Sequence, residues 1–287
     1  MSNVDVDAIV EAVTKEVLAQ LAGDALHECL ACMTDSLTLN AENARTVVAA
    51  GATRISYNGK GADVPTDLAG FIDHTLLKPE ASLGDIDRMC WEAIEYSFAS
   101  VCVNPYWVRR VAETLAGSDV ATCSVIGFPL GATPPQIKAM EARRALRDGA
   151  REIDMVLNVG ALKSGDLETV RADITGVADA CRERGAICKV ILETGLLEDE
   201  EIVIASRIAR EAKADFVKTS TGFGPGGATV YDVALMREAV GPAMGVKASG
   251  GIRSREDAEA MIAAGATRIG ASAGIAIVEG EESSEQY

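Results

Sequence analysis

The chain has 287 residues, of which 48% are hydrophobic, and its 27 Lys and Arg against 43 Asp and Glu give a formal net charge of −16. An acidic surface repels phosphate backbones, which argues against a nucleic-acid partner. No apolar run reaches the roughly 18 residues that cross a bilayer, and the acidic N-terminus is unlike a secretion signal, so we expect a cytoplasmic protein with reduced cysteines and no membrane partner.

The first 66 residues differ from the rest of the chain. Apolar residues three and four positions apart predict an amphipathic helix over about residues 5–23, and further helical stretches cover about 24–34 and 41–50. The polar segment 57–66 contains Gly and Pro and is typical of a linker. We therefore expect a helical extension over 1–66, one domain over 67–280 and an acidic tail over 281–287.

From residue 67 onward, short apolar runs alternate with longer amphipathic stretches. The runs predict eight strands, over residues 68–77, 98–104, 121–128, 152–158, 186–194, 215–221, 245–251 and 267–272. Helices are predicted over about 83–96, 105–116, 134–148, 165–184, 198–213, 229–240 and 254–264, and from about 273. Eight strand–helix units in about 210 residues have the count and size of a closed (β/α)₈ barrel, the TIM-barrel fold of the α/β class. A doubly wound sheet is the alternative, which we rank behind the barrel.

Charged side chains interrupt several of the apolar strands. Asp73 lies in the first predicted strand, Asp154 in the fourth, and Lys189, Lys218 and Lys247 lie in the fifth, sixth and seventh. Alternation along a strand predicts three pairs on shared faces: Lys189 with Glu193, Asp154 with Asn158, and Lys218 with Ser220. If these faces point inward, three ammonium groups and at least two carboxylates meet inside the barrel, where active sites lie at the C-terminal strand ends.

Such a group of charges has a structural and a catalytic interpretation. A structural ion-pair network is the simpler one for any single residue, but buried ion pairs often fail to recover their desolvation cost. Arginine would serve that role, and the chain has 18 Arg and only nine Lys. Lysine can lose its proton and attack a carbonyl to form a Schiff base, and a neighbouring cation is a recognised way to activate it. The pattern therefore favours lysine chemistry.

Three segments rich in Gly and Ser follow the last three strands, over residues 219–227, 249–251 and 270–274. Barrels often bind phosphate in this region with backbone amides. None of the segments matches a nucleotide-binding fingerprint, so no cofactor is expected.

His27 and His74 are far apart, and the Cys29–Cys32 pair has no second pair at ligand spacing. We interpret that pair as two small apolar residues and expect no metal centre.

Five segments resemble the deoxyribose-phosphate aldolase family: DHTLLKP (73–79), EIDMVLN (152–158), KVILETG (189–195), KTSTGFGPGGAT (218–229) and KASGGIR (247–253). The resemblance covers about residues 67–280. It implies a metal-independent class I aldolase, a lyase that reversibly cleaves 2-deoxy-D-ribose 5-phosphate to D-glyceraldehyde 3-phosphate and acetaldehyde in carbohydrate catabolism. We also expect a homo-oligomer. The alternatives are another Schiff-base phosphosugar aldolase or transaldolase, and a non-catalytic barrel that binds sugar phosphates.

The resemblance assigns roles to individual residues. It implies that Lys218 forms the Schiff base, that Lys247 is the neighbouring ammonium that activates it, and that Asp154 relays protons through water. It also implies that Lys189 holds Asp154 in place. The predicted substrate- and phosphate-binding residues are Gly222, Gly250, Gly251, Ser272, Asp73 and Cys102. Cys102 lies at a strand end, where it either faces the site or fills the core.

This chain departs from the family pattern at two positions. Phe223 stands where some members have a basic residue, and Ala273 stands where many have a second serine. Both changes leave more of the phosphate binding to backbone amides.

The terminal segments suggest further roles. The helix over 5–23 and the linker resemble the encapsulation peptides of enzymes packaged in bacterial microcompartments, which implies that residues 1–23 bind a shell protein. Sequestration would contain a volatile, reactive acetaldehyde. Docking on the barrel and an oligomer contact are the alternatives. Tyr287 at the end of the acidic tail either assists proton transfer at the mouth of the barrel or frays with the terminus.

Overall fold

A computed structural model of the protein describes residues 64–281. The helices predicted over 5–23, 24–34 and 41–50, most of the predicted linker, the shell-binding segment 1–23, the Cys29–Cys32 pair and Tyr287 lie outside the described residues. Within residues 64–281, no helix combines the length and the apolar character that crossing a bilayer requires.

Eight parallel strands form a closed barrel in chain order, with β8 paired to β1. The strands are β1 (Ile72–Leu76), β2 (Ser100–Val103), β3 (Ala121–Ile126), β4 (Glu152–Val156), β5 (Ile187–Ile191), β6 (Phe216–Lys218), β7 (Gly245–Ser249) and β8 (Arg268–Ala271). Each strand lies within one of the predicted runs. The (β/α)₈ barrel is confirmed, and the doubly wound alternative is wrong.

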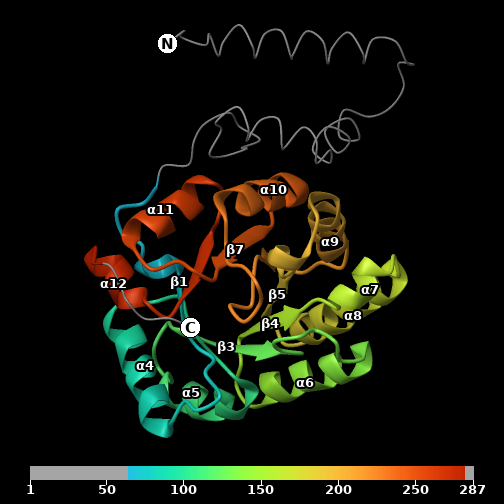
Figure 1. Ribbon diagram of the computed structural model, residues 1–287. Helices are drawn as coiled ribbons and strands as arrows, with labels where there is room; N and C mark the ends of the chain where they lie inside the picture. The colour runs from blue at the N-terminus through green and yellow to red at the C-terminus, as the bar shows by residue number, and fades with distance from the viewer. Residues whose placement is uncertain (1–63, 282–287) are drawn as a thin grey trace, which may run out of the picture. The chain divides into compact units, whose positions relative to one another are not determined.

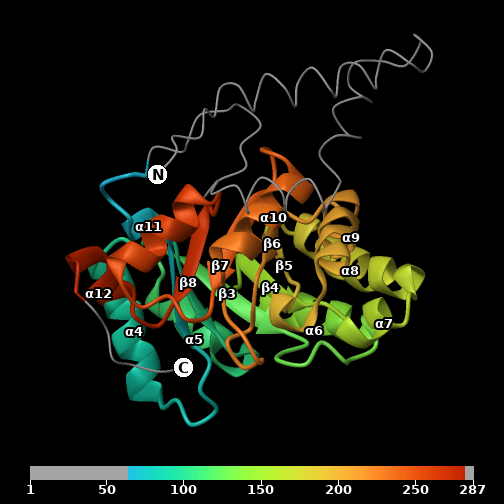
Figure 2. The same cartoon turned by 45° about the horizontal axis from the view of Figure 1, so that its top comes forward.

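The helices form a ring around the strands, as the two views in Figure 1 and Figure 2 show. They are α4 (Leu83–Glu95), α5 (Val108–Thr114), α6 (Pro135–Arg147), α7 (Val159–Lys163), α8 (Leu167–Arg182), α9 (Asp199–Glu211), α10 (Val230–Val240), α11 (Arg255–Ala263) and α12 (Gly274–Glu279). Ser82, Thr229 and Ser254 begin their helices by accepting a hydrogen bond from a backbone N–H of the first turn. Short 3₁₀ helices lie at Ala69–Phe71 (η1), Pro105–Trp107 (η2) and Thr194–Leu196 (η3).

Helix α7 lies in a segment where the sequence predicted no element. It has five residues, which is too short for an apolar periodicity to emerge. Asn158 is its N-cap, and the side chain of that residue accepts from Ala161 N at 3.1 Å.

The two faces of the strands have different roles. Outward-facing side chains such as Ile153, Val190 and Val217 belong to the main hydrophobic core between the barrel and the helices. Inside the barrel, Leu77, Cys102, Cys123 and Val125 form a second, small apolar cluster near β2 and β3. The charged inward positions lie on β1 and on β4 to β8.

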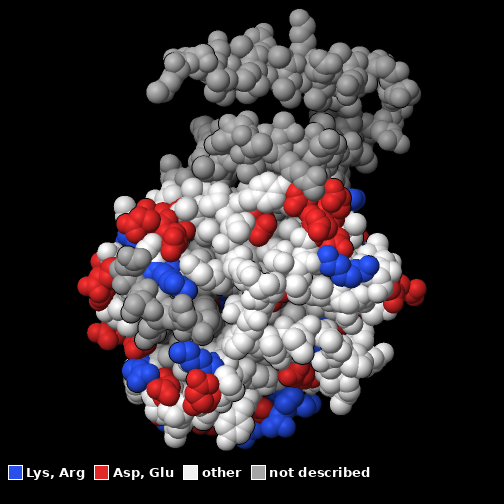
Figure 3. Space-filling view, in the orientation of Figure 1, with Lys and Arg blue, Asp and Glu red and all other residues white. Residues whose placement is uncertain are grey.

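The strand register places those charges level with one another. Lys189 pairs with Asp154, and Lys218 pairs with Lys247. The surface is differently arranged: on the face shown in Figure 3, acidic side chains gather toward the periphery and the middle is mainly uncharged. The charged groups inside the barrel are therefore distinct from the acidic groups at the surface.

Candidate active site

Seven charged side chains from six strands meet inside the barrel. They are Asp73 of β1, Glu152 and Asp154 of β4, Lys189 of β5, Lys218 of β6, Lys247 of β7 and Arg268 of β8. Six of them are at most 3% exposed, and the Arg268 side chain is 13% exposed. We call this set the seven-residue network.

Asp154 is the centre of the network. Its Oδ2 accepts hydrogen bonds from the Nζ atoms of Lys218 at 2.9 Å and Lys247 at 2.8 Å. Its Oδ1 accepts from Lys189 Nζ at 2.8 Å and from the Cys123 thiol at 3.2 Å. Burial alone would raise the pKa of Asp154, but the three ammonium groups outweigh it and hold that pKa well below its ordinary value. Asp154 is therefore a carboxylate at neutral pH.

Lys189 and Lys247 each contact further carboxylates. Lys189 Nζ lies 2.6 Å from Glu152 Oε2 and 3.2 Å from Asp73 Oδ2, and Lys247 Nζ lies 2.5 Å from Asp73 Oδ2. Burial would lower the pKa of both lysines, but Asp154 and Asp73 outweigh it and raise both above the ordinary value. These two lysines stay charged.

Sequence reasoning missed two members of the network. Arg268 lies 2.6 Å from Asp73 Oδ1 and 3.2 Å from Glu152 Oε2, and its guanidinium lies over the Phe216 ring. Both missed residues carried a signal: Arg268 is a charged residue in a predicted apolar strand, and Glu152 lies two positions before Asp154, on the same face.

The charges of the network do not balance. Three carboxylates face four cations. Within the part of the chain that the structure describes, Lys218 contacts one carboxylate, whereas Lys189 contacts three and Lys247 and Arg268 contact two each. Removal of the Lys218 proton would leave three cations against three carboxylates, a balanced arrangement for a buried cluster. Lys218 is thus the cation of the network with the fewest carboxylate contacts.

The loops that follow β6 and β7 are tied together beside the two lysines. Ser249 Oγ donates to Ser220 O at 2.7 Å, and Thr219 Oγ1 donates to Ser249 O at 3.0 Å. A Cβ at Gly227 would lie 2.4 Å from Gly250 O, so the two backbones approach too closely for any side chain there. Backbone amides of these loops can face an anion.

Three of the predicted phosphate-binding glycines lie on these joined loops. Gly222, Gly250 and Gly251 have φ values of 86°, 89° and 81°, which favour glycine. Ser272, which follows β8, lines a different feature, a cavity of about 310 Å³ with His74, Thr75 and Arg88 among its lining residues. That lining contains no member of the seven-residue network.

All three predicted shared faces run past the ends of their strands; for Lys218 with Ser220, β6 ends at Lys218 itself. β5 ends at Ile191, and Glu193 has a left-handed backbone with φ 59°, which turns its carboxylate away from Lys189. The Glu193 side chain accepts hydrogen bonds from the backbone N–H and the hydroxyl of Thr221. β4 likewise ends before Asn158, which caps α7. Alternation applies only while the strand continues.

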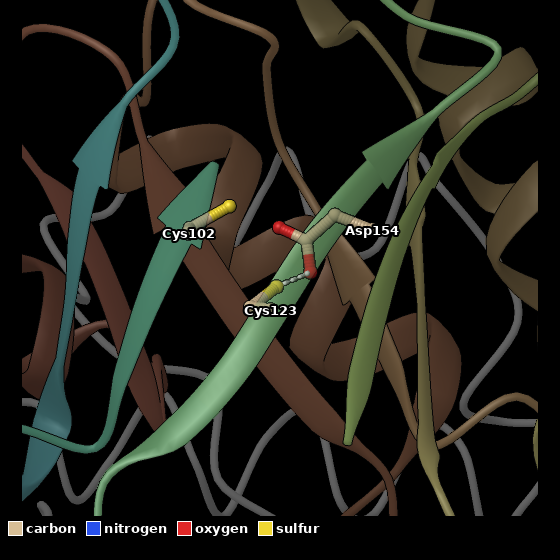
Figure 4. A group of neighbouring side chains, drawn as sticks. All are labelled: Cys102, Cys123 and Asp154. Atoms are coloured by element: carbon tan, nitrogen blue, oxygen red, sulfur yellow. Dashed lines mark hydrogen bonds between the residues drawn. The ribbon is translucent and has the colours of Figure 1, made fainter. Parts of the chain in front are cut away.

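Cys102 points into the barrel, toward Cys123 and Asp154 (Figure 4). It also packs in the inner apolar cluster, so both interpretations of this residue hold. One sulfur from each cysteine and one Asp154 oxygen lie within 4.8 Å of one another. A metal ion there would face the three ammonium groups around Asp154, which opposes its binding.

Comparisons with known proteins agree with this geometry. A family model described as DeoC/LacD family aldolase matches residues 65–280. The chain is 61% identical over 217 residues to a deoxyribose-phosphate aldolase of Streptococcus gordonii, covering 76% of this chain and 98% of the relative. It is 63% identical over 210 residues to that of Brevibacillus brevis, covering 73% and 94%. The tetrameric structure of deoxyribose phosphate aldolase from Aeropyrum pernix has a TM-score of 0.71 and 37% identity, covering 82% of this chain and 96% of that chain.

Proposed function

The chain belongs to the DeoC/LacD family of aldolases and is a lyase, and we propose that Lys218 carries its reaction as the Schiff-base nucleophile. The reaction is the reversible cleavage of 2-deoxy-D-ribose 5-phosphate to D-glyceraldehyde 3-phosphate and acetaldehyde. The observation that supports Lys218 is its place in the seven-residue network: it shares Asp154 Oδ2 with Lys247 and contacts the fewest carboxylates.

The first half of the reaction forms the Schiff base. The neutral Lys218 amine adds to the C1 aldehyde of the open-chain sugar, and the resulting carbinolamine loses water to give an iminium. A base then takes the C3 hydroxyl proton, the C2–C3 bond breaks, and its electron pair enters the iminium to form an enamine. C3 leaves as the aldehyde of glyceraldehyde 3-phosphate. The iminium is the electron sink of this step.

The second half regenerates the enzyme. The enamine takes a proton at C2, water hydrolyses the new iminium, and acetaldehyde leaves as the Lys218 amine returns. We assign the proton transfers to Asp154, acting through water. The iminium at Lys218 carries one positive charge, as the ammonium did, so Asp154 keeps its cationic neighbours while the C3 hydroxyl is deprotonated. Lys247 and Lys189 remain charged and keep Asp154 in position.

The substrate phosphate would bind to backbone amides of the joined loops after β6 and β7, near Gly222, Gly250 and Gly251. Ser272 follows β8 and lines the cavity of about 310 Å³ described above, so it would contact the phosphate only from that cavity. Asp73 acts from inside the barrel, where it orients Lys247. Phosphate is recognised here by oriented N–H groups rather than by exposed cations.

Borohydride trapping tests the role of Lys218. Wild-type enzyme incubated with substrate and borohydride should gain a covalent adduct that peptide mapping places on Lys218. Lys218→Met should lose the adduct and about 10³-fold or more of the activity, because removal of a covalent nucleophile leaves only binding and electrostatics. Lys163→Met, at a 40% exposed side chain in an ion pair with Glu201, is the matched control and should keep both.

Other results would identify an alternative. Trapping that persists in Lys218→Met would remove Lys218 from the mechanism. Binding of the sugar phosphate without any adduct would indicate a non-catalytic barrel, and cleavage of a different phosphosugar in a product assay would indicate another Schiff-base aldolase or a transaldolase.

We also propose that residues 1–23 package this enzyme by binding a microcompartment shell protein, and that the barrel forms homo-oligomers. The amphipathic spacing of residues 5–23 supports the first, and a match that covers 98% of a relative but only 76% of this chain fits a segment outside the aldolase domain. Deletion of residues 1–23 should keep aldolase activity and abolish co-assembly with shell protein. Co-assembly unchanged by the deletion would contradict the packaging role. Sedimentation of the full chain tests the oligomer.

A further inference from the structure

We propose that Cys102 and Cys123 are a reversible redox pair, which a hydroperoxide converts to a disulfide inside the barrel and which then stops the aldolase reaction. The consequence for activity rests on the proposed function, whereas the disulfide itself does not. Cys102 and Cys123 are register partners on the neighbouring strands β2 and β3, and both are completely buried. Both side chains point toward Asp154 (Figure 4).

The geometry allows the bond. Neighbouring strands lie about 4.8 Å apart, which is within the Cα separation of about 4.4–6.8 Å that disulfides require. The two sulfurs already lie within 4.8 Å of each other. A disulfide between directly paired strand residues is strained, and strained disulfides are the ones that thiols reduce readily.

The two thiols differ in reactivity. A hydrogen bond with Cys123 lowers the pKa of Cys102, against burial and the Asp154 charge, which raise it, and with the support of the Lys247 and Lys218 charges. Burial raises the pKa of Cys123 well above its ordinary value. Cys102 is therefore the thiol that attacks an oxidant, and Cys123 is the one that resolves the product.

The chemistry balances with hydrogen peroxide as the oxidant. The Cys102 thiolate attacks one peroxide oxygen, so an S–O bond forms, the O–O bond breaks, and hydroxide leaves to be protonated to water. Cys123 then attacks the sulfenic sulfur of Cys102, so the S–S bond forms, the S–O bond breaks, and the Cys123 proton leaves with the hydroxide as a second water. Two thiols lose two electrons and two protons, and peroxide becomes two waters.

The disulfide would act on the catalytic carboxylate. In the reduced protein, Cys123 donates to Asp154 Oδ1 at 3.2 Å and lies 3.3 Å from Lys189 Nζ. A disulfide removes that donor and moves the sulfur toward β2. Displacement of Asp154 by about 1 Å would cost about 10²-fold in rate. Oxidation is thus coupled directly to the site of proton transfer.

The test uses the full chain with Cys29→Ala and Cys32→Ala, because that pair could form its own disulfide. We expect hydrogen peroxide to lower the aldolase activity about tenfold or more, dithiothreitol to restore it, and peptide mapping of the oxidised protein to find one cross-link between the Cys102 and Cys123 peptides. With Cys123→Ala in the same background, peroxide should instead cause a loss that dithiothreitol does not reverse. Sulfenic acid without a resolving thiol proceeds to sulfinic acid. Each activity is expressed relative to the untreated form of the same variant.

A second buried pair provides the matched control. Cys181 on α8 and Cys188 on β5 are also close partners, outside the network. Cys181→Ala should respond to peroxide and dithiothreitol as the parent does. The proposal is overturned if the reversible loss persists in Cys123→Ala, if Cys181→Ala abolishes it, or if the cross-link forms while activity is retained. Activity and borohydride trapping before oxidation report separately on the proposed function.

Discussion

At the scale of single residues, the buried lysines differ in how many carboxylates hold their charge. Lys189 and Lys247 are surrounded by Asp154, Asp73 and, for Lys189, Glu152, whereas Lys218 shares one oxygen of Asp154 with Lys247. Several carboxylate partners raise the pKa of a lysine, so the side chain stays protonated. Lys218, the proposed nucleophile, has the fewest carboxylate partners of the three lysines.

Asp154→Asn separates Schiff-base formation from proton transfer. The substitution keeps the shape and removes the charge, so we expect kcat to fall by about 10²–10⁴-fold, the usual contribution of a general acid–base. Lys218 loses its carboxylate partner but keeps its amine, so borohydride should still trap the substrate. Steady-state kinetics and adduct mass measure the two effects, with circular dichroism to confirm folding. Equal loss of trapping and turnover would place Asp154 in Schiff-base formation instead.

Phe223→Lys tests how the site recognises phosphate. Phe223 follows Gly222, is 47% exposed, and lies edge-on to Phe128 with ring centroids 5.4 Å apart. An ammonium group there should lower KM for the phosphorylated substrate about tenfold, a gain of about 1.4 kcal/mol. The gain should shrink with added salt. Phe223→Met is the uncharged control, and an equal change with unphosphorylated 2-deoxyribose would contradict an effect on phosphate.

At the scale of elements, buried ion pairs also connect helices outside the barrel. Lys138 of α6 and Asp173 of α8 are both completely buried, with Nζ 2.5 Å from Oδ2, and Lys138 Nζ donates to Val156 O at 2.8 Å. This contact joins two helices to the C-terminal end of β4, the strand that carries Asp154. The pair therefore holds this end of β4 in place, although neither residue contacts the seven-residue network.

Lys138→Met should destabilise the protein by about 3–5 kcal/mol, because it leaves the Asp173 carboxylate buried without a cation. Urea unfolding followed by circular dichroism measures the change. Arg143 and Glu183 provide the control on the same elements, since they form a pair at 3.4 Å with side chains 44% and 60% exposed. Arg143→Met should cost less than about 1 kcal/mol. Similar losses in the two variants would mean that burial does not determine the strength of the pair.

At the scale of the whole molecule, the seven-residue network links stability to pH. The neighbouring cations overcome burial and hold the pKa of Asp73 and Asp154 below their ordinary values, so the folded protein keeps these groups ionised where the unfolded chain binds protons. Their contribution is therefore present above the unfolded pKa of about 4 and is lost as pH falls below it. Burial raises the pKa of Asp232 and Glu238, which acts in the opposite direction.

We expect the free energy of unfolding to fall by about 1–3 kcal/mol between pH 5 and pH 3, since each depressed carboxyl contributes up to about 1.4 kcal/mol per pH unit. Urea unfolding at fixed ionic strength measures this slope. Asp73→Asn removes one of the two groups and should lose less stability on acidification. A slope unchanged by that substitution would assign the acid sensitivity to other carboxyls.

The alternation of apolar runs and amphipathic stretches was sufficient to predict the barrel, because periods of two and 3.6 residues are local properties of the chain. The three strand lysines, Asp73 and Asp154 were also evident, since charge within an apolar strand stands out by itself. α7 was missed because a five-residue helix has too little periodicity to detect.

Only the tertiary structure decided which groups meet. Closure and register bring Arg268 of β8 to Glu152 of β4, across 116 positions of sequence, and place Cys102 beside Cys123. Strand alternation predicted Glu193 on the same face as Lys189, but the left-handed backbone at Glu193 places its carboxylate against Thr221 instead. Whether a buried lysine can release its proton depends on the balance of all the charges around it. That balance is a property of distances between strands, which no local pattern contains.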